Sequence, residues 1–191
     1  MIYYQQIAKQ WDRLNSLSPE DSKILNNSIE DGVFEGFNQF STQLMNSLTR
    51  DFPIVNNLAY NDIKQIKSGF SNAVFSGYLI YVAFQLISNI KRPLFQQGLK
   101  YDPTVMNEYN CIIVPEQPNI KSERFFKILD ENPAIELLFE KVTSIELNIL
   151  RKNNPGFGDL SANIGFMIRD LMARGVFMGY GLGFAESCLR G

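Results

Sequence analysis

Apolar residues recur every three or four positions along most of the chain, which is the spacing of one face of an α-helix. This pattern predicts helices over residues 2–15, 18–48, 61–90, 121–130, 133–152 and 159–189, with a short helical turn over 54–60. The sequence therefore predicts an all-α fold, in which residues 1–191 form a single-domain bundle of six or seven helices.

Residues at the expected helix ends support these boundaries. Ser18 can cap a helix that begins with Pro19, and Asn132 precedes Pro133 in the same way. A polar cap followed by proline is typical of a helix start, because proline has no N–H that needs a partner there. The sequence NNPGFG after residue 152 is typical of a helix end.

Residues 93–119 lack the helical pattern and contain several prolines and turn-forming residues. Within them, CIIV at 111–114 is apolar and rich in β-branched residues, which favours a short extended segment. We expect an irregular segment at 93–119 on one side of the bundle. Long ordered loops often carry function, but an insertion between helical parts would have the same composition.

Three short stretches repeat one pattern, in which a small residue is followed by Val-Phe-x-Gly and an aromatic residue. They are GVFEGF at 32–37, AVFSGY at 73–78 and GVFMGY at 175–180. On a helix, the small residue and the motif glycine lie in one apolar stripe. In the second copy, Asn72 and Ser76 fall on the opposite side, which we expect to be a polar face.

Glycine inside a helix destabilises it by about 0.5–1 kcal/mol relative to alanine, so these positions need a compensating interaction. Small residues four apart form a groove that lets a second helix approach closely. The predicted groove consists of Gly32, Gly36, Ala73, Gly77, Gly175, Gly179 and Gly183. Either another helix or a partner chain would fill it. Two or three long helices grooved in this way would form the centre of the bundle. A groove that admits a ligand is the alternative.

The chain contains no histidine and only two cysteines, Cys111 and Cys188. Histidine is the commonest general base and a common transition-metal ligand, so its absence argues against an enzyme, a metal site and a cofactor. Glu186 follows an apolar stretch; if it is buried, it needs a partner such as Arg174 or Arg190, or a raised pKa.

Partners and location are limited by charge and hydropathy. The formal net charge is −2, and basic residues form only short clusters, so a nucleic-acid partner is not favoured for the isolated chain. Residues 69–90 carry no charge, but their serine, asparagine and glutamine residues favour a buried central helix over a membrane span. With no signal peptide apparent, we expect a cytoplasmic protein.

These features predict a non-catalytic helical interaction module or assembly subunit, with a protein partner or a second copy of the chain as its ligand. The alternative is a bundle that binds an apolar small molecule or a lipid in a cavity lined by aromatic residues. The chain has fifteen phenylalanines and eight tyrosines to supply such a lining.

Overall fold

The computed structural model describes residues 19–20, 41–42, 45–46, 53, 57–87, 103–113, 116–158 and 162–190. These residues contain five α-helices, α4 (Tyr60–Ile87), α5 (Pro103–Ile113), α6 (Ile120–Glu131), α7 (Pro133–Asn153) and α8 (Ala162–Arg190), and a 3-10 turn, η2 (Pro155–Gly158). No strand occurs among them, so the predicted all-α class is confirmed for the described part. The predicted helix 2–15, most of 18–48 and the first repeat at 32–37 lie outside it.

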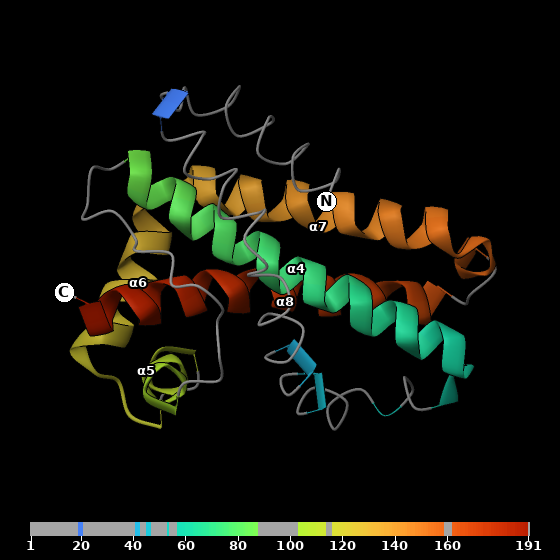
Figure 1. The fold of residues 1–191 in the computed structure, drawn as a ribbon, viewed down its shortest axis with the longest axis horizontal. Helices are drawn as coiled ribbons and strands as arrows, with labels where there is room; N and C mark the ends of the chain where they lie inside the picture. The colour runs from blue at the N-terminus through green and yellow to red at the C-terminus, as the bar shows by residue number, and fades with distance from the viewer. Residues whose placement is uncertain are drawn as a thin grey trace.

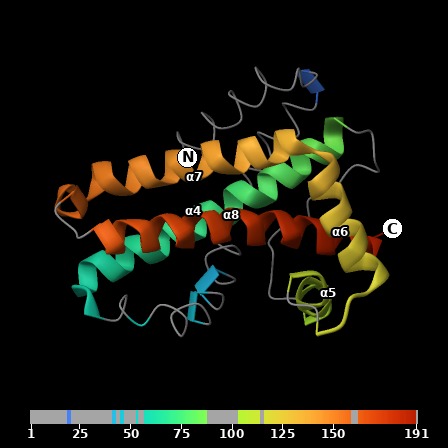
Figure 2. The same ribbon diagram turned by 180° about the vertical axis from the view of Figure 1, so that it is seen from behind.

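The two longest helices run in the same direction and cross near their middles, whereas α7 runs the opposite way beside them (Figure 1). Helices α5 and α6 lie around the C-terminal end of α8 (Figure 2). The buried apolar side chains of α4, α7 and α8 face one another and form the core. The crossing of α4 and α8 is therefore the centre of the fold.

The start of α6 is held by a capping box. The Asn119 side chain accepts a hydrogen bond from the backbone N–H of Ser122 at 2.9 Å, and the Ser122 hydroxyl accepts one from the N–H of Asn119 at 3.0 Å. Two otherwise unpaired helical N–H groups are satisfied in this way. Helix α7 begins at Pro133 as predicted, but Asn132 does not cap it through its side chain; that amide donates to Ile128 O at the end of α6.

The expectation of an irregular segment was wrong for residues 103–113, which form helix α5. Tyr109 and Ile112 of this helix are almost completely buried, and Ile113 contacts Gly181 of α8. These apolar positions have helical spacing, so a helix can place them on α8 together. Tertiary burial thus overrides the strand preference of the β-branched residues.

Candidate functional site

The backbones of α4 and α8 touch directly where the second and third repeats meet. A Cβ atom added to Gly77 would lie 1.8 Å from the carbonyl oxygen of Val176, and one added to Gly179 would lie 1.8 Å from that of Val74. Val74 and Val176 occupy the same position in the two repeats, and so do Gly77 and Gly179. Because each glycine contacts the valine of the other repeat, the contact has a local twofold symmetry. Only glycine allows so close an approach of two backbones.

The neighbouring small residues belong to the same contact. A Cβ atom on Gly175 would lie 2.9 Å from that of Ala73, and one on Gly183 would meet the Tyr81 side chain at 2.6 Å. Ala73 is itself completely buried. The structure thus brings five of the seven groove positions together inside the chain, while Gly32 and Gly36 lie outside the described residues.

The side of α4 opposite the crossing is not the solvent-facing polar surface that the repeat suggested. Ser76 is 0% exposed, and its hydroxyl donates to Oε1 of Glu146 on α7 at 3.0 Å. The expectation fails at Ser76 because α7 covers this face of α4 and supplies an acceptor for the hydroxyl. Asn72, one turn earlier, remains partly exposed.

Glu186 is buried, and a tyrosine of α4 is one of its hydrogen-bond partners. The Tyr78 hydroxyl donates to Oε2 of Glu186, whereas Arg174 lies on the surface and pairs with Asp170 at 2.9 Å. The Tyr78 hydroxyl of α4 thus supplies a hydrogen bond to a carboxyl group for which the sequence suggested an arginine partner. Both Glu186 and Glu146 therefore contribute to packing among the long helices.

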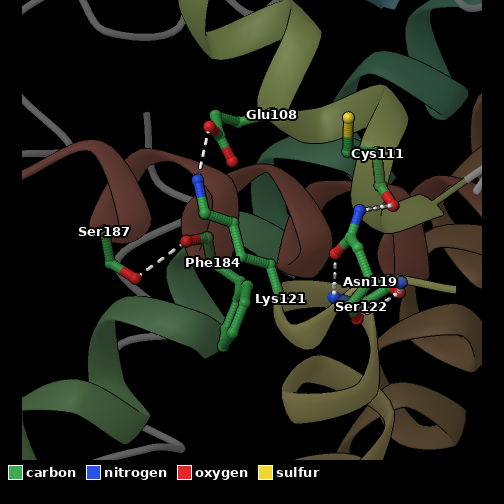
Figure 3. A network of polar contacts seen from close by, with 7 residues as sticks. All are labelled: Glu108, Cys111, Asn119, Lys121, Ser122, Phe184 and Ser187. Atoms are coloured by element: carbon green, nitrogen blue, oxygen red, sulfur yellow. Dashed lines mark hydrogen bonds and ion pairs between the residues drawn. The ribbon is translucent and has the colours of Figure 1, made fainter.

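A chain of hydrogen bonds joins α4 to the last turns of α8. The Tyr81 hydroxyl accepts from Gln85 Nε2 at 2.5 Å and donates to Ser187 Oγ at 2.6 Å. The Ser187 hydroxyl donates in turn to Phe184 O at 2.8 Å (Figure 3). Burial raises the pKa of Tyr81 to about 12, so the phenol is neutral at physiological pH.

Aromatic rings fill the space beside this network. Tyr180 lies 5.2 Å from Tyr81 and 5.3 Å from Phe139, and Phe125 lies 5.3 Å from Phe184, measured between ring centroids. Edge-to-face contacts at these separations are favourable. These five aromatic side chains beside α8 are therefore in contact with one another.

An open hollow of about 510 Å³ lies between the end of α5 and the start of α6. Its lining consists of Glu108, Cys111, Pro118, Asn119, Ile120, Lys121 and Glu123. Lys121 Nζ lies 2.5 Å from Oε1 of Glu108, and this hydrogen bond raises the lysine pKa (Figure 3). The Asn119 amide donates to Cys111 O at 3.5 Å and so bridges the two helices.

No protein-family model, curated protein or solved structure matches the chain. Its function is therefore inferred from the geometry alone.

Two kinds of site are not seen in the part of the chain that the structure describes. No group of three cysteine, aspartate or glutamate side chains there could hold a metal ion. None of the described helices is long and apolar enough to cross a membrane. Cys188 is half-buried, and burial raises its pKa, which disfavours the reactive thiolate.

Sequence reasoning missed the hollow between α5 and α6. Glu108 and Lys121 are 13 positions apart, and the segment that carries Glu108 was expected to be irregular, so no helical spacing related the two residues. The sequence contains one usable signal for this surface, because Ile120 is a large apolar residue directly after the capping Asn119. In the structure Ile120 is 83% exposed.

Proposed function

We propose that the chain is a non-catalytic helical interaction module, an assembly subunit that binds another protein chain at the corner formed by α5 and α6. The observation that carries this proposal is Ile120, a large apolar side chain that is 83% exposed on the rim of the hollow. Apolar residues beside a concave surface are typical of binding sites for a partner.

The hydrogen bonds at the start of α6 support the same proposal. The Asn119–Ser122 capping box fixes the first turn of α6, and the Asn119 amide joins that turn to α5. A surface that is ordered before binding loses less conformational entropy when a partner docks. Ile120 is therefore presented on a preorganised helix end.

The glycine groove has a different role in this proposal. We propose that Gly77 and Gly179 serve packing within the chain, because each is already in contact with the backbone of the opposite long helix. A partner that docked on these residues would have to displace one helix from the other. The interaction surface is accordingly assigned to side chains outside the α4–α8 crossing.

Buried hydrogen bonds support a structural use of the acidic residues in the core. Glu146 and Glu186 receive hydroxyl donors from Ser76 and Tyr78, and both carboxyl groups are at most 5% exposed. A general acid or base must reach a substrate proton. The alternative of a cavity for an apolar ligand has less support, because the aromatic rings beside α8 fill that volume with one another.

The proposal is tested with two variants that each place a charge on an exposed apolar position. Ile120→Asp changes the proposed surface, and Phe166→Asp is the control, since Phe166 is 69% exposed and lies near the start of α8, which begins at Ala162. Light scattering after size-exclusion chromatography measures association with a second copy. Cross-linking in cells that express the chain, followed by mass spectrometry, measures association with another protein.

We expect a partner, or a mass above that of the 21.8 kDa monomer, for the parent and for Phe166→Asp. Ile120→Asp should reduce this association by about tenfold or more, because a carboxylate would be desolvated at the contact. The proposal is wrong if neither measurement detects association, or if both variants associate as the parent does.

A further inference from the structure

Three helix ends lie together at the end of the bundle away from α5 and α6 (Figure 1 and Figure 2). A Cβ atom added to Gly69 of α4 would lie 3.5 Å from Leu150 of α7 and 3.4 Å from Met172 of α8, so these residues mark one level of the core. Helices α4 and α8 begin on one side of this level, and the antiparallel α7 ends on the same side. The residues beyond it are 60–68 of α4, 151–153 of α7 and 162–171 of α8.

Positive side chains predominate at this end, which we call the basic end. The five basic residues in these three segments are Lys64, Lys67, Arg151, Lys152 and Arg169. None of them forms an ion pair with a carboxylate of the described residues. The acidic residues of the same segments are Asp62 and Asp170, and Asp170 is paired with Arg174 at 2.9 Å. Folding thus brings together basic clusters that are short and separate in the sequence.

Each of the two long helices also has an exposed aromatic residue near its start, followed one turn later by a cation. On α4, Tyr60 is 80% exposed and precedes Lys64; on α8, Phe166 is 69% exposed and precedes Arg169. Residues three or four apart lie on the same face of a helix. On both helices, therefore, the aromatic ring lies nearer to the tip of the bundle than the basic group.

The helix backbones add to the positive charge. The starts of α4 and α8 both lie at the basic end, and the first N–H groups of a helix carry a partial positive charge. The end of α7 carries the opposite partial charge, which Arg151 and Lys152 in its last turn offset. This end of the molecule is therefore positive, although the formal net charge of the chain is −2.

We infer that the basic end docks on an anionic lipid surface, with Tyr60 and Phe166 among the headgroups and the basic side chains on the lipid phosphates. Aromatic rings are favoured at the boundary between headgroups and acyl chains. Lysine and arginine can keep their charge at the phosphates while their aliphatic stems lie against apolar surface. Each basic residue close to an anionic membrane strengthens binding by about fivefold.

The order of the side chains favours a membrane over a nucleic acid, which also carries phosphates and can stack its bases on aromatic rings. Single strands bind along a basic groove that contains the aromatic residues. At the basic end, Tyr60 and Phe166 instead stand nearer to the tip than the cations one turn behind them. A broad anionic surface can contact all three helix ends at once.

Co-sedimentation of the full chain with lipid vesicles tests the inference. One set of vesicles contains phosphatidylcholine alone, and the other contains phosphatidylcholine and phosphatidylserine in equal parts. We expect binding to the mixed vesicles only, and we expect this binding to weaken as salt is added, because salt screens the attraction between exposed charges. A single-stranded uridine oligonucleotide is the competing ligand.

Three variants locate the lipid-binding surface. Lys64→Glu should lower the partition coefficient for the mixed vesicles by about tenfold, because an attractive charge becomes a repulsive one. Lys141→Glu, the same change at an exposed position in the middle of α7, is the matched control and should leave the partition coefficient unchanged. Tyr60→Ser should lower it by about fivefold, because the ring no longer enters the headgroup layer.

Equal binding to both kinds of vesicle, or to neither, would overturn the inference. It is also wrong if Lys64→Glu and Lys141→Glu weaken binding to the same extent, or if Tyr60→Ser binds as the parent does. Binding of the oligonucleotide without binding to the mixed vesicles would assign the basic end to a nucleic acid instead. The inference is independent of the partner at α5 and α6, and the light scattering that uses Phe166→Asp contains no lipid.

Discussion

Replacing Gly179 with alanine should destabilise the protein, although alanine is the better helix former. The new Cβ atom would lie 1.8 Å from the carbonyl oxygen of Val74 and 2.9 Å from the backbone nitrogen of Tyr78. Close C···O contacts in proteins are about 3.3–3.6 Å, so the two backbones would have to separate by roughly 1.5 Å. Backbone atoms inside a helix cannot rotate away as the end of a side chain can.

The expected loss follows from this separation. A gap of about 0.5–1 Å already removes a quarter to a half of the dispersion attraction between facing atoms. Overpacked core positions are destabilised by about 1–3 kcal/mol, and alanine regains about 0.5–1 kcal/mol through its helix propensity. Because the obstacle is backbone, we expect a net decrease in the free energy of unfolding of about 2 kcal/mol. Gly77→Ala should behave alike, since its Cβ atom would meet Val176 O at the same distance of 1.8 Å.

Gly165 provides a control on the same helix. A Cβ atom added there meets no atom within 4 Å, so Gly165→Ala should increase the free energy of unfolding by about 0.5–1 kcal/mol. Urea denaturation followed by circular dichroism measures all three variants against the parent. If Gly179→Ala and Gly77→Ala are as stable as the parent or more stable, the close approach of α4 and α8 does not exist in solution.

Two further predictions concern the buried polar groups. Ser76→Ala removes the hydroxyl that donates to Glu146 at 3.0 Å, and urea denaturation should show a free energy of unfolding lower by about 1–2 kcal/mol. The control Ser144→Ala, at an exposed position of α7, should change that free energy by less than about 0.5 kcal/mol. Burial raises the pKa of Tyr81 from 10.0 to about 12, so the unfolded chain loses this proton first. The stability contributed by the neutral phenol should be complete below pH 10 and disappear as the pH rises from 10.0 to about 12. Denaturation at a series of pH values should show that the free energy of unfolding decreases less steeply with pH for Tyr81→Phe than for the parent. An unchanged slope would contradict the raised pKa of Tyr81.

The sequence by itself determined where the described helices begin and end at several places. The proline at 133 and the sequence NNPGFG bound α7 as expected, because helix starts and ends depend on local backbone groups and their nearest neighbours. The spacing of apolar residues likewise located α4, α6 and α8, since periodicity is a property of one segment. For the same reason the repeat could indicate that Gly77 and Gly179 need a close neighbour without indicating which one.

The tertiary structure alone decided which surfaces meet. Ser76 and Glu146 are 70 positions apart, and no pattern within either segment reveals that α7 covers the polar side of α4. Residues 103–113 form a helix because burial on α8 stabilises it, which the sequence around CIIV could not show. The hollow beside Glu108 depends in the same way on two helices packed against a third. Local propensity acts over a few residues, whereas burial and buried hydrogen bonds arise only when distant segments come together.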